Sequence, residues 1–487
     1  MKKLITSIIF VLISIINTFG QHYQTIGSNR IAYFDNEYGN IKCIRIDSVK
    51  HQQVDSVLFP FATIQKLDYE CFSPFFASWI GKSITIKDNG LNEFNNKTGN
   101  TISIKTNANL GEKWIAFVLP DSLTIEATVL SHDTLTFIGI TDSVKTIGFQ
   151  SYDKNMNKIN KGLNGMQLQI SKNYGFVKTF NFYLFPDLQA DYPIEKFEEY
   201  DLIGLSNPKV GVNNLTWFEV NDFQVGDELH ILDESSCRNI EYGYATTNKA
   251  IYRYLERNDY PDSIVYRYAR KQSIYTNWFD SSSFLYYDDT LKTVIKSNSL
   301  FDKLPGEPIV IDNAAFNYYM TNESPLSKTY PGNNENFMFR GDSCWTMVIA
   351  DGCLTADKYI MGLGGPYYSC THTFCWGGEE RKLVYYKKGD ITWGSPLEIS
   401  GIADISNAKD IKVYPNPSKK DIYITFPDSN YHNPCIYIYN IQGELQKVKQ
   451  LESNNSLINI SELRKGIYIL KIADNETILK IDKLIIE

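Results

Sequence analysis

The sequence predicts an all-β protein made of several antiparallel domains, and three observations lead to this prediction. Aromatic residues are abundant, with 33 Tyr and 27 Phe among 487 residues, and flat side chains pack well on the pleated face of a strand. Short runs that alternate apolar and polar residues recur along the chain, separated by turn residues. Long helical periodicity is missing from the sequence. We therefore expect antiparallel meanders that form open barrels or sandwiches.

The N-terminal segment 1–20 has the pattern of a secretory signal peptide. Lys2 and Lys3 precede a largely apolar stretch, 4–19, which ends at Gly20. A membrane anchor is the alternative, but it needs about 20 apolar residues, and this stretch is shorter and interrupted by polar residues. We expect cleavage before Gln21, which leaves a mature chain without a membrane span.

The region 21–208 is predicted to be the first β-rich domain. Its runs alternate in polarity, as strands with one wet face do, and turn residues such as Asp88-Asn89-Gly90 separate them. The runs that we expect to be strands are 84–86, 101–106, 114–118, 123–130, 135–140, 144–150, 166–170 and 176–185.

The region 209–400 is predicted to be a second β-rich domain with longer strands. The clearest hairpin joins 250–255 to 264–270 through the turn 258–262. Tyr252 and Tyr254 then fall on the same face of the first strand. We expect an antiparallel sheet that curls around an apolar interior as an open barrel.

The last part of the chain combines a polar linker, 401–410, with a small β-sandwich, 411–487. Five short apolar runs separated by turn residues favour a sandwich there. Its motifs resemble those of the type A C-terminal sorting domain of bacterial type IX secretion. The residues that carry the resemblance are Tyr414, Pro415, Asn416, Pro417, Gly443, Gly466 and Tyr468.

This resemblance implies an export route for the region in front of the tail, which is the cargo. The type IX translocon would recognise the tail in the periplasm and move the folded cargo across the outer membrane. A sortase-like peptidase would then trim the tail, and the protein would be released or attached to surface polysaccharide. The expected location is therefore secreted or cell-surface, and the linker 401–410 is the natural place for cleavage.

The overall charge excludes one class of partner. The formal net charge is −8 and the sequence pI is near 5.5, whereas nucleic-acid binding relies on clustered Lys and Arg that displace counterions from phosphates. We expect no nucleic-acid partner, and the sequence contains no motif that indicates a cofactor.

The eight cysteines of this exported chain are first interpreted as disulfide partners, because the periplasm and the exterior are oxidising. We expect at least two disulfides in the cargo, which involve some of Cys344, Cys353, Cys370 and Cys375. The alternative is a zinc site around Cys370, His372 and Cys375, but structural zinc needs four ligands. The cargo holds an odd number of cysteines, so at least one thiol stays unpaired or pairs with another molecule.

A cluster around the start of one predicted strand could bind a metal or serve as an acid and base. Glu228 and His230 share a strand face, and Asp233, Glu234 and Cys237 follow. A strand end with a solvated acidic turn explains the same residues, and we favour that interpretation. We assign no metal site.

A tripeptide of Asp, then Ser or Thr, then an aliphatic residue recurs in the cargo. It resembles the acceptor pattern for periplasmic O-glycosylation in bacteria that use type IX secretion. An alternative is that Asp-Ser simply opens turns before strands. The candidate acceptors are Ser48, Ser56, Ser122, Thr134, Ser143, Ser263 and Thr290.

For the cargo the sequence favours a non-enzymatic binding or structural role. The alternative is a secreted hydrolase that acts on extracellular polysaccharide or protein. Two carboxylates about 5–10 Å apart in an aromatic-lined groove would favour the hydrolase.

Overall fold

The computed structural model describes most of the 487-residue chain. The expected signal peptide, 1–20, and the expected linker, 401–410, lie outside the described residues. The described residues are 23–36, 39–66, 71–73, 77–120, 122–186, 197–237, 243–278, 281–331, 336–341, 344–348, 356–372, 377–399, 411–426, 433–451, 455–474 and 477–487.

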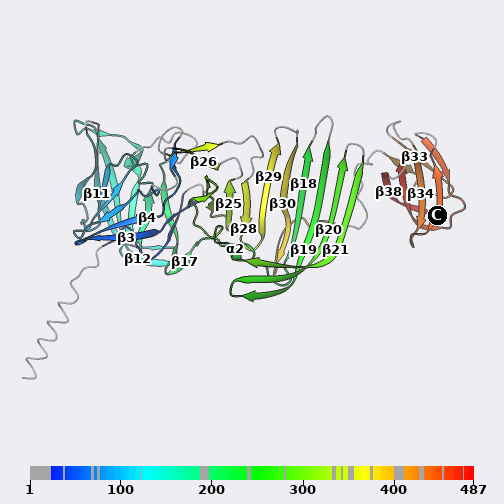
Figure 1. Ribbon diagram of the computed structural model, residues 1–487, viewed down its shortest axis with the longest axis horizontal. Helices are drawn as coiled ribbons and strands as arrows, with labels where there is room; N and C mark the ends of the chain where they lie inside the picture. The colour runs from blue at the N-terminus through cyan, green and yellow to red at the C-terminus, as the bar shows by residue number, and fades with distance from the viewer. Residues whose placement is uncertain are drawn as a thin grey trace, which may run out of the picture. The chain divides into compact units, whose positions relative to one another are not determined.

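Strands form nearly all of the regular structure, and the described strand pairings are antiparallel (Figure 1). The predicted all-β antiparallel class is confirmed. By internal contacts the chain forms two compact units, and each takes more than one stretch of sequence. The first unit comprises 1–224, 257–266 and 293–373, and the second comprises 225–256, 267–292 and 374–487. The domain boundaries expected from the sequence stay predictions.

The first unit contains most of the short strands, one 3-10 turn η1 (Gly162–Gly165) and one short helix α2 (Trp217–Val220). Its strands are β1 (Ala32–Asp35), β2 (Asn40–Ile44), β3 (Ile46–Gln52), β4 (Asp55–Pro60), β5 (Gln65–Lys66), β6 (Phe72–Ser73), β7 (Ile84–Ile86), β8 (Leu91–Asn95), β9 (Thr101–Lys105), β10 (Lys113–Leu119), β11 (Leu123–Phe137), β12 (Ile140–Tyr152), β13 (Lys158–Ile159), β14 (Gln167–Ser171), β15 (Gly175–Phe180), β16 (Glu199–Ser206), β17 (Lys209–Gly211), β22 (Ile309–Ile311), β23 (Ala314–Phe316), β24 (Tyr319–Thr321), β25 (Ser327–Pro331), β26 (Asn336–Gly341), β27 (Cys344–Val348), β28 (Ala356–Ile360) and β29 (Gly364–His372).

The strand order within the first unit explains how distant segments meet. One meander follows the order β3-β4-β7-β8-β9. A second sheet joins β16 to β1, β1 to β2 and β2 to β24, so residues near 40, 200 and 320 become neighbours. Between them lies an aromatic core in which Phe94 and Phe182 stack with ring centroids 4.0 Å apart.

The second unit has fewer and longer strands, followed by the strands of the C-terminal tail. Its strands are β18 (Glu228–Cys237), β19 (Tyr244–Tyr260), β20 (Ser263–Trp278), β21 (Ser282–Lys296), β30 (Gly377–Lys388), β31 (Ile391–Gly394), β32 (Lys412–Tyr414), β33 (Asp421–Thr425), β34 (Pro434–Asn440), β35 (Leu445–Gln450), β36 (Asn455–Asn459), β37 (Gly466–Asp474) and β38 (Thr477–Ile486). The ends of β19, β20 and β21 belong to the first unit.

Strands β30, β18, β19, β20 and β21 form an open sheet of long strands (Figure 1). The predicted hairpin of β19 and β20 is present. The expected curl around an apolar interior is not, because side chains on both faces of β19, β20, β21 and β30 are mostly half-buried or exposed. Both faces of these strands carry charged residues, which a closed apolar interior would not accept.

The tail folds as two small sheets, β32-β33-β36 and β35-β34-β37-β38. Their inner faces share an aliphatic core that includes Ile424, Ile436, Ile458 and Leu470. This arrangement matches the predicted sandwich, and the core makes the tail a unit with its own source of stability.

Among the residues that the structure describes, none of the helices is long and apolar enough to cross a membrane.

Candidate functional site

The Tyr-Pro-Asn-Pro motif of the tail connects its two sheets. Tyr414 ends β32, and the Asn416 side chain then reaches β38 of the other sheet. There the Ile485 amide donates to Asn416 Oδ1 at 2.9 Å, and Asn416 Nδ2 donates to the Lys483 carbonyl. One amide side chain thus satisfies a donor and an acceptor of the last strand, which a carboxylate could not do.

The other motif residues shape turns and the core of the tail. Gly443 has φ +82 in the turn that follows β34, a conformation that glycine adopts at little cost. Gly466 begins β37, and Tyr468 is buried with its hydroxyl donating to the Arg464 carbonyl at 2.8 Å. The structure therefore brings all the motif residues into one folded module.

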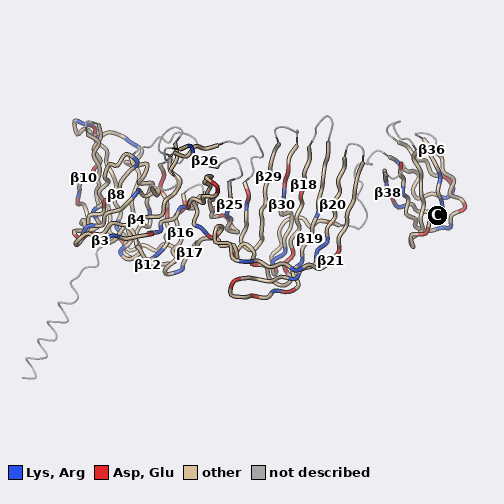
Figure 2. The backbone as a smooth tube through the Cα atoms, viewed as in Figure 1, with Lys and Arg blue, Asp and Glu red and all other residues tan. Residues whose placement is uncertain are grey.

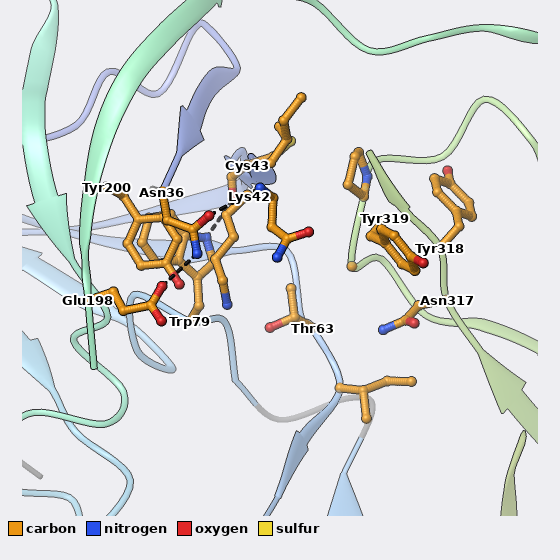
Figure 3. Close-up of a pocket in the computed structure, with 15 residues that line it drawn as sticks. Asn36, Lys42, Cys43, Thr63, Trp79, Glu198, Tyr200, Asn317, Tyr318 and Tyr319 are labelled. Carbon is orange, nitrogen blue, oxygen red and sulfur yellow. Dashed lines mark hydrogen bonds between the residues drawn. The ribbon is translucent and has the colours of Figure 1, made fainter. Parts of the chain in front are cut away.

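The first unit contains a cleft of about 680 Å³ between β2, β16 and the segment before β24 (Figure 3). Residues far apart in sequence line it because β2 pairs with β1 and β24, and β1 pairs with β16. A cleft of this volume lies within the range of small-molecule sites.

On one wall of the cleft, two aromatic rings lie next to the side-chain amine of a lysine. The ring centroids of Trp79 and Tyr200 lie 5.2 Å apart. Lys42 Nζ lies 5.8 Å from the Trp79 centroid and 5.5 Å from the Tyr200 centroid. Trp79 Nε1 donates to the Cys43 carbonyl at 2.7 Å. Both rings are buried.

Beside these two rings, Asn36 and Glu198 form a hydrogen-bonded polar pair. Asn36 Nδ2 donates to Glu198 Oε2, and Asn36 Oδ1 accepts the backbone amide of Asn40 at 3.1 Å (Figure 3). The carboxylate and the amide are therefore already oriented before a ligand arrives, which lowers the entropic cost of binding.

Asn317 and Tyr319 lie on the opposite side of the opening from Asn36, Glu198 and Trp79 (Figure 3). Tyr319 is exposed. Within the described part of the chain the side-chain amide of Asn317 makes no hydrogen bond, and neither does that of Asn40. Amides without protein partners at a cleft wall are suited to a ligand that both donates and accepts hydrogen bonds.

Behind the cleft wall lies a group of buried polar residues. Burial raises the pKa of the Cys43 thiol and of the Tyr318 phenol. Lys328 Nζ lies 4.1 Å from the Tyr318 ring centroid, and burial lowers the pKa of this amine to about 7. The Tyr318 hydroxyl is buried without a hydrogen-bond partner among the described residues.

The Glu228 and His230 cluster is a structural pair. His230 Nδ1 accepts the Leu397 amide at 2.8 Å, so Nε2 carries the proton and donates to Glu228 Oε1 at 2.8 Å. Both ring nitrogens are thereby engaged, and neither offers a lone pair to a metal. The described residues contain no group of three or more side chains that could hold a metal ion.

Cys344 forms a disulfide, but with Cys71, which its spacing in sequence did not indicate. The two are 273 residues apart, and they meet because β6 pairs with β27 through Phe72 and Trp345. Cys370 is also disulfide-bonded, which removes the thiolate that a zinc site would need.

Two of the remaining cysteines of interest, Cys353 and Cys375, lie outside the described residues. Cys43 and Cys237 are free thiols, which agrees with the expectation that at least one cargo thiol stays unpaired.

The candidate O-glycosylation acceptors differ in accessibility. Ser143 is half-buried, and its hydroxyl contacts Tyr23 Oη at 2.9 Å and His132 Nε2 at 3.3 Å. It also pairs directly with Thr134 across the β11–β12 hairpin. The exposed acceptors are Ser48, Ser122, Thr134 and Thr290, and the half-buried ones are Ser56, Ser143 and Ser263. Modification of any of them stays a prediction.

Reasoning from the sequence did not find the cleft. Its walls come from segments near 40, 79, 198 and 317, and each residue by itself is an ordinary strand or turn residue. The dense run of polar residues from Asp35 to Asn40 was the one local feature that could have drawn attention to it.

Residues 412–487 match the family of secretion system C-terminal sorting domains, so the tail is the sorting domain that its motifs indicated. Over 182 residues the chain is 23% identical to β-agarase A of Zobellia galactanivorans, a match that covers 34% of this chain and 31% of that protein. The chain thus spans about a third of this relative's length.

Among solved structures, the extracellular domain of the putative one component system BT4673 from B. thetaiotaomicron aligns over 96% of this chain and 100% of that chain. The sequence identity is 10% and the TM-score is 0.14, which carries no argument about fold or function.

Proposed function

We propose that this chain, which type IX secretion exports by means of the sorting domain at 412–487, is a binding protein. Its cleft in the first unit would hold a small, polar, largely uncharged ligand such as a sugar. Export places the protein at the cell surface or in the extracellular space. Trimming by a sortase-like peptidase within 401–410 and attachment to surface polysaccharide belong to the same proposal.

The chemistry of the cleft lining supports this proposal. Amides from Asn36, Asn40 and Asn317 supply donors and acceptors together, as polyhydroxylated ligands require. Lys42 and Glu198 bring opposite charges to the same wall, so the cleft favours neither anions nor cations.

The alternative function is that of a hydrolase, and the similarity to β-agarase A is the observation that favours it. Glycoside hydrolysis by general acid and base needs two carboxylates on either side of the scissile bond. Among the described residues that line the cleft, Glu198 is the one carboxylate. The lining therefore supports binding without hydrolysis.

The test is calorimetric titration of the purified cargo with a panel of neutral oligosaccharides, with product analysis of each mixture. We expect binding without release of shorter products. Asn317→Ala removes an amide that has no protein partner, so it should weaken binding by about tenfold or more and leave the thermal midpoint unchanged.

The matched control is Asn155→Ala, an exposed asparagine of the same unit outside the cleft. It should bind as the wild type does. If the wild type instead hydrolyses an oligosaccharide and Glu198→Gln abolishes that activity, the protein is a hydrolase and the binding proposal is wrong.

A further inference from the structure

A row of polar side chains crosses the long-stranded sheet of the second unit, from β30 through β18, β19 and β20 to β21. We call it the polar row, and its members lie on one face. Asp233 pairs directly with Asn248 on one neighbouring strand and with Arg381 on the other. In order across the sheet its members are Arg381, Asp233, Asn248, Gln272, Arg270 and Asp289.

Hydrogen bonds between the inner members hold this part of the row in place. Arg381 Nη1 donates to Asp233 Oδ1 at 3.1 Å, and Asn248 Nδ2 donates to Asp233 Oδ2 at 2.8 Å. Gln272 Nε2 then donates to Asn248 Oδ1 at 2.9 Å. Burial raises the pKa of Asp233 even though Arg381 favours its charged form, so the row lies in a partly dehydrated surface.

The outer end of the row joins β20 to β21. Arg270 Nη1 donates to Gln272 Oε1 at 3.1 Å, and its other nitrogens donate to both oxygens of Asp289 at 2.9 and 2.7 Å. This bidentate geometry fixes the guanidinium plane. The same guanidinium lies 4.5 Å from the Tyr287 ring centroid on β21.

Tyrosines lie alongside the polar row on the same sheet. Tyr252 and Tyr268 make an edge-to-face pair with centroids 5.7 Å apart. The Tyr252 phenol is close enough to Arg381, Asp233 and Arg270 for their charges to influence its pKa, which burial raises. Half-buried tyrosines next to fixed polar groups offer both an apolar ring and a hydroxyl.

Several polar atoms of this surface have no protein partner. Within the described part of the chain the hydroxyls of Tyr252 and Tyr268 make no hydrogen bond. Arg381 Nε is buried and also lacks a partner there. The two tyrosine hydroxyls are not among the buried polar atoms without a partner, so they face solvent and are available to a ligand.

Charge and length identify the kind of molecule that fits the surface. The row contains two arginines and two aspartates that pair with each other, so it attracts neither polyanions nor polycations. Figure 2 shows basic and acidic residues interspersed on these strands. Five strands at a spacing of about 4.8 Å give a row of roughly 19 Å, longer than a single sugar and suited to an extended chain.

We propose that the polar row and its tyrosines form a binding surface for an extended neutral polysaccharide, which lies across the strands. The hydroxyls of the polymer would bond to the hydroxyls of Tyr252 and Tyr268 and to the free lone pairs of the row. The apolar faces of its sugar rings would pack on Tyr252 and Tyr268. This site is separate from the cleft of the first unit.

The test is affinity electrophoresis of the whole mature chain in gels that contain agarose, laminarin or soluble cellulose ether as neutral polymers, or heparin as a polyanion. We expect retardation by at least one neutral polymer and none by heparin. Tyr252→Phe/Tyr268→Phe keeps the rings and removes both hydroxyls, and Arg381→Gln removes the guanidinium that holds Asp233 in the row. Each variant should raise the apparent dissociation constant for the polymer about tenfold or more.

Matched controls lie on the opposite face of the same strands. Tyr275→Phe and Arg253→Gln should migrate as the wild type does, and so should Asn317→Ala, since that residue belongs to the cleft. Thermal midpoints establish that each variant is folded. Absence of retardation by all three neutral polymers would overturn the proposal, as would equal loss of retardation in the opposite-face controls or salt-sensitive binding to heparin.

Discussion

Lys328 lies in the core of the first unit with its side chain fully buried. Its Nζ donates to the carbonyls of Phe301 at 2.7 Å and Lys303 at 3.1 Å. Burial lowers the pKa of this amine to about 7, although Asp302 and Cys43 favour the charged form. Nothing in the local sequence indicates such an environment, because the two carbonyls that Lys328 contacts belong to residues that lie 25 and 27 positions earlier in the chain.

This environment gives stability a defined pH dependence. Between pH 7 and the usual lysine pKa of about 10.4, the folded chain binds fewer protons than the unfolded chain, so the contribution of Lys328 to the unfolding free energy rises with pH. Replacement by Lys328→Met removes this contribution. The unfolding free energy of the wild type relative to Lys328→Met should therefore increase from pH 7 to 10, by on the order of a few kcal/mol.

Urea denaturation at a series of pH values measures this difference. Lys209→Met is the control, since that exposed side chain loses little hydration on folding, and its difference from the wild type should be flat. A flat difference for Lys328→Met as well would mean that the amine is not dehydrated in the folded protein.

At the scale of single elements, local patterning predicted much of the fold. Runs such as 101–106 and 144–150 became β9 and part of β12, because alternation of apolar and polar residues is a local property. The openness of the long-stranded sheet was not predicted, since the same alternation suits a barrel and a single layer. The tail motif was predictable because each of its short segments is contiguous in sequence and the segments follow in a fixed order, whereas the cleft depends on pairings across some 280 residues.

The Cys71–Cys344 disulfide connects two such distant elements, β6 and β27. In the chain-entropy model a cross-link across this many residues stabilises by about 5 kcal/mol. Cys71→Ser/Cys344→Ser should therefore lower the thermal midpoint of the first unit, measured by calorimetry. Cys237→Ser, which removes a free thiol, should leave that midpoint within a degree or so, and equal midpoints for all three proteins would contradict a stabilising role.

At the scale of the whole molecule, the chain combines an export module with cargo that carries two distinct polar surfaces. The tail has its own aliphatic core and its own sheets, so it does not rely on the cargo to fold. Asn416 holds the last strand through Lys483 and Ile485, which places the motif and the C-terminus in one module. Export of the protein therefore depends on the tail, and the proposed binding surfaces lie in the cargo.

Localisation of a chain that ends at Ile399, in a host with type IX secretion, tests this separation most directly. We expect this shortened chain to accumulate in the periplasm as folded, protease-resistant cargo, while the full chain reaches the surface or the medium. Normal export of the shortened chain would contradict the assignment of 412–487 as the sorting domain.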